Sequence, residues 1–224
     1  MNKSPLRTAA SLVLLRGDKN NPQILLGRRK ASLRFMPGYY VFPGGCIDDT
    51  DYEEIANMNI NAINPISGVM ANLTKAETAT YIFGAIRELW EETGLLLGQP
   101  SKTPLAGFSN MMKAFNANQL SPQIYNCQCI AQAITPAKLP IRFNTYFFSA
   151  DGTNATTDSP PCGELEDIGW HDYEDVFEYL HIADVTRSVL KEAKNHWNCI
   201  DTPVNTGLRV PLMTYPLDKL EIQR

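Results

Sequence analysis

The stretch Arg87-Glu88-Leu89-Trp90-Glu91-Glu92-Thr93-Gly94-Leu95 combines a helical pattern with a cluster of carboxylates. Upstream of it, Thr74-Lys75-Ala76-Glu77 has the order of a capping box, in which a hydroxyl and a carboxylate satisfy free amides of the first helical turn. Apolar residues then recur at helical spacing, and Gly94 can take the left-handed conformation that ends a helix. The sequence therefore predicts a helix from about 75 to 93, with a buried stripe of Ile82, Ala85, Ile86, Leu89 and Trp90.

Three carboxylates share one face of this predicted helix. Glu88, Glu91 and Glu92 stand at i, i+3 and i+4, so that like charges lie close together. Oxygen ligands on a rigid element suit Mg²⁺ or Mn²⁺, which keep several waters and are completed by substrate phosphates. The alternatives are a solvated acidic face or an i,i+4 ion pair between Arg87 and Glu91. Pro43-Gly44-Gly45 favours the metal site, because two glycines after a strand let the backbone approach a metal or phosphate closely.

The composition of the chain is that of a globular protein. Its 224 residues are 44% hydrophobic and 20% charged, and the formal net charge is −4. This charge does not favour non-specific binding to nucleic acid, and no apolar run approaches the roughly 18 residues that cross a bilayer. Five cysteines without C-x-x-C spacing argue against a disulfide framework or a thiolate zinc site. We therefore expect a cytoplasmic protein that binds neither nucleic acid nor membranes.

Strands and helices alternate along the chain. A turn-forming stretch at 17–22 separates two apolar runs that are typical of a hairpin, and further strands and a C-terminal helical part follow. This order predicts an α/β sandwich with a mixed sheet, formed as a single domain over residues 1–224. The expected strands are 9–15, 23–28, 40–42, 124–133, 144–149 and 166–170, and the helical part is 173–197.

Gly45 together with Arg87–Leu95 resembles the Nudix box, G-x5-E-x7-R-E-U-x-E-E-x-G-U, in which U is a bulky aliphatic residue. The resemblance implies the Nudix α/β/α sandwich. Gly45 and Arg87 are 42 positions apart, whereas the family pattern has 14, so 28 additional residues interrupt the box as an insertion at about 49–79. We expect no clear counterpart of the family's first Glu, although Asp48 resembles the acidic residue of a G-G-x-x-E beginning. The inserted residues are compatible with a lid or with a homodimer contact.

A narrower resemblance links the chain to the coenzyme A diphosphatases of this family. Their pattern L-L-T-x-R-[SA]-x3-R-x3-G-x3-F-P-G-G matches the spacing of residues 25–45, with Gly27 in place of Thr and Lys30 in place of the small residue. A long insertion inside the box is also typical of the acyl-CoA diphosphatase branch. The resemblance implies hydrolysis of coenzyme A or an acyl-CoA to 3′,5′-ADP and a 4′-phosphopantetheine species.

The resemblance also implies roles for individual residues. Glu88, Glu91, Glu92 and the Gly44 carbonyl are the implied metal ligands, and Arg87 orients a catalytic Glu through an ion pair. Glu166 is favoured over Glu164 as a general base from the loop at 163–170, the alternative being an acidic loop that caps a strand. The expected catalytic set is Glu91, Glu88, Arg87 and Glu166.

Substrate contacts are expected from the basic segment before the glycines. Four cations in this segment are expected to neutralise substrate phosphates, including a 3′-phosphate: Arg29, Lys30 and Arg34, together with Arg28. The alternative is that they only form the solvated end of a strand. Tyr39 stacks on adenine or lines a pantetheine slot, unless it is a core residue. The small-molecule nucleotide is expected to be coenzyme A or acyl-CoA. Rival interpretations are an ADP-ribose, NADH or dinucleotide diphosphatase and a nucleotide-sensing Nudix domain without turnover.

Overall fold

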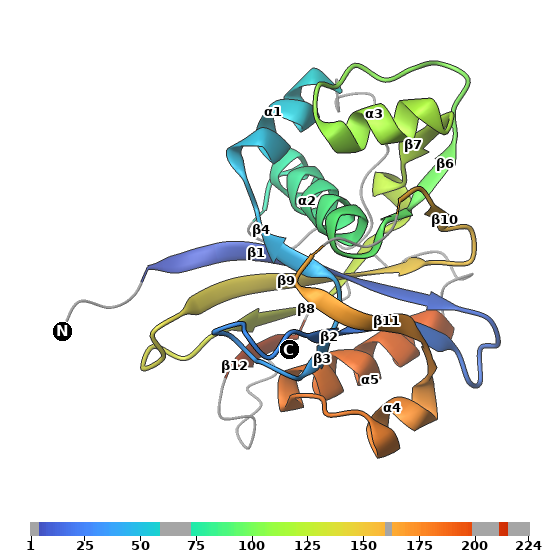
Figure 1. Ribbon diagram of the computed structural model, residues 1–224. Coiled ribbons are helices and arrows are strands. Elements are labelled where there is room, and N and C mark those ends of the chain that lie inside the picture. The colour runs from blue at the N-terminus through green and yellow to red at the C-terminus, as the bar shows by residue number, and fades with distance from the viewer. Residues whose placement is uncertain (1–4, 59–72, 160–162, 199–210, 215–224) are drawn as a thin grey trace.

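The computed structural model describes residues 5–58, 73–159, 163–198 and 211–214, and a mixed sheet lies at its centre (Figure 1). The strand order is β11-β2-β1-β9-β8-β12, with β1 parallel to β9, β8 parallel to β12 and the other pairs antiparallel. Short strands β3 and β4 pair with β2 and β1. The bounds are β1 Leu6–Arg16, β2 Gln23–Arg29, β3 Tyr40–Val41, β4 Gly44–Cys46, β8 Gln128–Ile134, β9 Arg142–Asp151, β11 Leu165–Asp172 and β12 Leu212–Thr214.

Helices cover both faces of this sheet (Figure 1). Helices α1 (Asp49–Asn57), α2 (Lys75–Thr93) and α3 (Asn110–Ala117) lie on one side, and α4 (Tyr173–Tyr179) and α5 (Asp184–Asn198) lie on the other. This arrangement confirms the predicted α/β sandwich with a mixed sheet. The smaller elements are β5 (Leu95–Leu96) paired with β10 (Thr156–Thr157), β6 (Gly98–Pro100) paired with β7 (Leu120–Pro122), and the 3₁₀ turn η2 (Ile124–Asn126).

Strand β1 explains why the sheet is buried on both faces. Its side chains alternate between two hydrophobic clusters, with Leu12 and Leu14 packed on the α2 side and Val13 and Leu15 on the α5 side. All four are fully buried. A continuous apolar run is the expected pattern for a central strand covered by helices on both sides.

Helix α2 confirms the sequence prediction at both ends. Thr74 Oγ1 accepts a hydrogen bond from the Glu77 amide at 3.1 Å, and the Thr74 amide donates to Glu77 Oε2 at 2.8 Å. These two bonds are the reciprocal capping box. At the other end Gly94 adopts φ 72°, and its amide donates to the Trp90 carbonyl. The carboxylates Glu88, Glu91 and Glu92 therefore lie in the last turn and a half of a helix with fixed ends.

Two predicted segments differ from the structure. The strand predicted at 124–133 begins only at Gln128, because Ile124–Asn126 first form the η2 turn. The helical part at 173–197 is two helices, separated by an extended segment in which Ile182 is buried in the α5-side cluster. The predicted insertion at 49–79 starts with α1 and reaches the first turn of α2, and residues 59–72 lie outside the described residues.

No helix among the described residues has the length and hydropathy needed to cross a membrane.

Candidate active site

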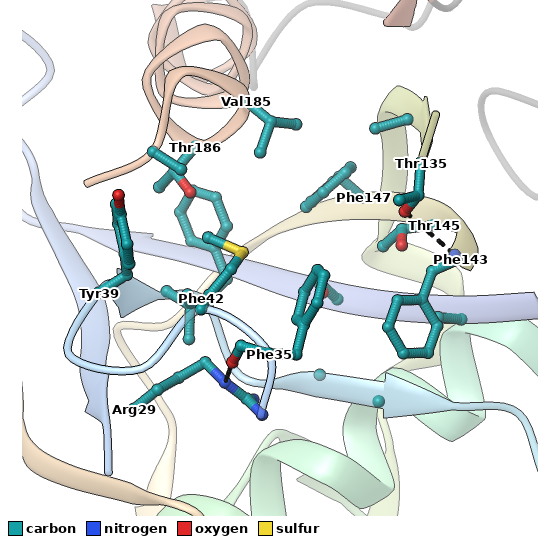
Figure 2. A pocket seen from close by; sticks show the side chains of 18 of the residues that line it. Arg29, Phe35, Tyr39, Phe42, Thr135, Phe143, Thr145, Phe147, Val185 and Thr186 are labelled. Carbon is teal, nitrogen blue, oxygen red and sulfur yellow. Dashed lines mark hydrogen bonds between the residues drawn. The ribbon is translucent and has the colours of Figure 1, made fainter. Parts of the chain in front are cut away.

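A cavity of about 1000 Å³ lies between the end of α2, strands β1 and β4, the loop between β8 and β9, and the start of α5 (Figure 2). One end is polar, and Glu88, Glu91, Glu92, Gly44 and Gly45 line it. Apolar side chains line much of the rest of the cavity, among them those of Phe35, Ile134, Leu139, Phe143 and Val185. The fold thus brings the predicted carboxylate cluster and the predicted glycines to one end of a cavity.

Arg87 is the centre of an ion-pair network at the polar end. Its Nη1 donates to Glu88 Oε1 at 2.9 Å and to Glu91 Oε2 at 3.0 Å, and its Nη2 donates to the Cys46 carbonyl at 2.9 Å. The guanidinium is buried, and the neighbouring carboxylates hold its pKa above the usual range despite that burial. The i,i+4 pair with Glu91 is thus present together with the contact to Glu88, and Arg87 fixes the positions of two carboxylates.

Asp51 is the partner of Arg87 that the sequence analysis missed. Arg87 Nε donates to Asp51 Oδ1 at 2.8 Å and Nη2 donates to Oδ2 at 3.0 Å, and Asp51 is fully buried. The expectation that the first Glu of the box has no counterpart was therefore wrong. Asp51 stands six positions after Gly45, which is the spacing of that Glu, and counting along G-x5-E could have found it. Asp48 lies at the start of α1, where its amide donates to Asp51 Oδ2.

Glu88 and Glu92 are held against the glycines of β4. A Cβ atom built on Gly45 would overlap the Glu88 carboxylate, so no other residue fits there without displacing that side chain. The Gly44 amide donates to Glu92 Oε2 at 3.0 Å. Burial raises the pKa of Glu88 to about 7 and that of Glu92 to about 8. Burial thus disfavours the charged form of both carboxylates, and a cation bound beside them would offset that cost.

The donor set of this end fits a hard divalent cation. Among the described residues that line the cavity, Arg29 is the single Lys or Arg, whereas Glu88, Glu91, Glu92, Glu164 and Asp184 carry carboxylates. Oxygen donors of this kind are the ligands of Mg²⁺ and Mn²⁺. Within the described residues, however, no group of three or more acidic, histidine or cysteine side chains is already arranged around a common metal position. Mg²⁺ requires few protein ligands, because waters and substrate phosphates complete its shell.

The loop before β11 brings Glu164 to the cavity and leaves Glu166 outside its lining. Gly163 packs on the end of α2, since a Cβ atom there would lie 3.2 Å from the Glu92 Cα atom. Glu164 lines the cavity and pairs with Arg29 at 2.8 Å. Glu166 pairs instead with Arg28 at 3.1 Å and is not among the lining residues. The structure thus places Glu164 at the cavity in place of the preferred Glu166, because Glu164 lies in the loop before β11 whereas Glu166 lies in the strand opposite Arg28 of β2.

The four basic residues separate into two groups. Arg29 lines the cavity, and its Nε donates to the Phe35 carbonyl at 2.9 Å (Figure 2). Lys30 Nζ donates to the Gly163 carbonyl at 2.7 Å and so ties the two loops together. Arg34 is exposed, and neither it nor Lys30 is among the lining residues. Of the predicted substrate-binding residues, the structure brings Arg29 and Tyr39 to the cavity wall.

Tyr39 has an aromatic partner that no sequence pattern indicates. Its ring stacks on that of His181, with ring centroids 3.9 Å apart and an angle of 29° between the planes. Both residues line the cavity, although 142 positions separate them in the sequence. Because His181 lies in the extended segment between α4 and α5, only the fold could reveal the pair.

Comparison with known proteins identifies relatives of the chain. No model of a known protein family matches it. It is 30% identical over 155 residues to a Caenorhabditis elegans protein named as nudix hydrolase 7, and 32% identical over 99 residues to the acyl-coenzyme A diphosphatase NUDT19 of Xenopus laevis. These alignments cover 65% and 35% of this chain but 44% and 26% of the relatives, so the chain spans less than half the length of the curated relatives it matches.

The fold is that of a solved Nudix enzyme. A crystal structure of a NUDIX hydrolase from Alicyclobacillus acidocaldarius superposes with a TM-score of 0.68 at 24% identity, over 92% of this chain and 98% of that one. The chain thus has the Nudix fold. Over part of its length the chain is also similar in sequence to a protein named as a nudix hydrolase.

Proposed function

We propose that this chain is a divalent-metal-dependent diphosphatase that hydrolyses a nucleoside diphosphate-linked substrate, and that its substrate is coenzyme A or an acyl-CoA. The observation that carries the proposal is the cavity itself. Three carboxylates and two glycines line it together with many apolar side chains. Such a site has a place for a charged diphosphate and a place for an uncharged chain.

We propose that Mg²⁺ or Mn²⁺ is bound by the carboxylates of Glu88, Glu91 and Glu92, with the Gly44 carbonyl as a further ligand. When bound, such an ion neutralises diphosphate oxygens and lowers the pKa of a coordinated water. The contribution of Arg87 is positional, because its contacts to Glu88 and Glu91 set the two carboxylates before substrate arrives. Arg29 is the one Lys or Arg that the described residues bring to the cavity wall, and it cannot neutralise a diphosphate by itself, which supports the need for a metal.

Water attack on one phosphorus needs a group that accepts a proton. We propose Glu164 for this role in place of Glu166, since Glu164 lies on the cavity wall and its loop packs on the α2 end that carries the metal ligands. Its ion pair with Arg29, at 2.8 Å, orients the Glu164 side chain. A charged carboxylate can accept the proton that the attacking water loses as the bridging P–O bond breaks.

The apolar wall supports coenzyme A and acyl-CoA within this class. A pantetheine arm, with or without an acyl chain, can lie along Phe143 and Leu139, whereas ADP-ribose offers only a polar sugar there. The coenzyme A motif at residues 25–45 and the similarity to an acyl-coenzyme A diphosphatase over part of the chain support the same choice. The products would be 3′,5′-ADP and a 4′-phosphopantetheine species. A homodimer and a cytoplasmic location stay predictions from the sequence.

The test is chromatographic detection of products from a substrate panel with Mg²⁺ or Mn²⁺. The panel holds coenzyme A, acetyl-CoA, a long-chain acyl-CoA, ADP-ribose, NADH and a diadenosine polyphosphate. We expect 3′,5′-ADP to form fastest. Faster release of AMP from ADP-ribose or NADH would support the proposed diphosphatase activity but overturn the proposed preference for coenzyme A. No turnover of any substrate would instead favour a nucleotide-sensing domain.

A further inference from the structure

The stacked rings of Tyr39 and His181 form a flat aromatic surface on the cavity wall. His181 is exposed, Tyr39 is half-buried, and both line the cavity. Neither residue belongs to either of the two hydrophobic clusters. One face of Tyr39 is covered by His181 at 3.9 Å. Such a backed ring presents its remaining surface to whatever enters the cavity.

Backbone hydrogen bonds fix the position of this surface. The Arg29 amide donates to the Tyr39 carbonyl, and the Gly38 amide donates to the Arg29 carbonyl, both at 2.9 Å. The Tyr40 amide donates to the His181 carbonyl at 2.9 Å and so joins the two loops directly. Because the loops are tied before a ligand binds, ordering Tyr39 costs little at the moment of binding.

The opposite side of the cavity has a different aromatic geometry. Phe35 and Phe143 meet edge to face, with ring centroids 5.2 Å apart and an angle of 73° between the planes. Tyr39 and Phe143 lie on opposite sides of the cavity, and Thr145 lies on the Phe143 side (Figure 2). The edge-to-face rings of Phe35 and Phe143 can contact a flexible apolar chain from two directions. The stacked ring of Tyr39, in contrast, can stack on a further flat ring, such as a nucleotide base.

We propose that the Tyr39–His181 pair is the base-binding surface of the site and orients the substrate. This inference rests on the proposed function and adds the direction in which the nucleotide lies. The base stacks on Tyr39, the diphosphate meets the carboxylate end, and the non-nucleotide arm runs along Phe143. His181 is a positioning residue, since it acts by holding the Tyr39 ring.

The experiment measures binding of two probes that differ only by the base, AMP and ribose 5-phosphate, by calorimetry with Mn²⁺ present. Base–aromatic stacking is worth about 5- to 150-fold in affinity, so Tyr39→Ala should weaken AMP binding by about 10-fold and leave ribose 5-phosphate unchanged. His181→Ala should weaken AMP binding by a smaller factor, and His181→Phe should restore it, because an aromatic ring again backs Tyr39. Tyr179→Ala is the matched control, since Tyr179 lies on α4 with 70% of its surface exposed and is outside the cavity lining.

The outcomes separate this inference from the proposed function. If wild-type protein hydrolyses the panel and binds AMP, but Tyr39→Ala binds AMP equally well, the base-binding surface is wrong and the diphosphatase stands. Equal losses of AMP and ribose 5-phosphate affinity would also overturn it, because they would indicate a collapsed cavity. If wild-type protein neither binds AMP nor hydrolyses any substrate, the proposed function fails and the base-binding surface fails with it.

Discussion

Asp51 and Arg87, 36 residues apart in the sequence, form a buried bidentate ion pair with N–O distances of 2.8 and 3.0 Å. The pair joins the start of α1 to the last turns of α2, so it closes the carboxylate site across the residues inserted between them. A planar guanidinium that meets a carboxylate with two parallel bonds also has a fixed orientation. The same guanidinium then holds Glu88 and Glu91, so the position of the cluster depends on a residue outside it.

The first prediction concerns this pair. Asp51→Asn removes the charge that balances the buried side of Arg87, and breaking a buried pair costs about 3–5 kcal/mol. We expect the lower part of that range, because Glu88 and Glu91 still contact Arg87. The free energy of unfolding, measured in denaturant, checks the value. Asp48→Asn is the matched control, since Asp48 is exposed and lies 3.7 Å from Arg87, and it should change stability by less than about 1 kcal/mol.

The second prediction tests the metal ligands. Glu91→Gln keeps the size of the side chain but removes the charge of a proposed ligand, and kcat should fall by more than about 100-fold, since even changes to groups behind metal ligands cost about 10- to 100-fold. Stability should change little, because the Glu91 side chain is 46% exposed. Steady-state kinetics with Mn²⁺ and a thermal unfolding curve provide the two measurements. Near-normal turnover of this variant would refute the assignment of the metal site.

Local patterns predicted the parts of the protein that depend on neighbours in sequence. The ends of α2, the hairpin of β1 and β2, and the shared face of Glu88, Glu91 and Glu92 follow from capping, turn and helical spacing. The cavity could not be predicted in this way, because it forms where the end of α2, the Gly163–Glu164 loop and the start of α5 meet. Asp51 was visible in the spacing from Gly45, whereas the partnership of Tyr39 with His181 had no signal in the sequence.

The third prediction follows from the raised pKa values of Glu88 and Glu92. Both carboxyls bind a proton more tightly when folded than unfolded, so without metal the stability of the fold falls as pH rises from their ordinary pKa of 4.5 toward about 7 and about 8. Between pH 6.5 and 8.5, the melting temperature in EDTA should therefore decrease. Added Mn²⁺ should raise the melting temperature more at pH 8.5 than at pH 6.5, because the metal competes with protons for the same oxygens.

The matched variant for this pH effect is Glu92→Gln, which removes the group with the larger shift. Its melting temperature in EDTA should depend less on pH over the same window, and Mn²⁺ should stabilise it less than wild type. A wild-type curve that rises with pH in EDTA would contradict the burial of these carboxyls.

The last prediction separates two glutamates that both pair with arginine. Glu164→Gln should lower kcat by about 100-fold or more, the usual loss when a general base is removed, whereas Glu166→Gln should stay within about threefold of wild type. Both substitutions remove one ion pair with a neighbouring arginine, at 2.8 Å for Glu164 and 3.1 Å for Glu166, so loss of an ion pair alone cannot explain a difference between them. Equal activity of the two variants would instead place the proton acceptor within the α2 carboxylate cluster.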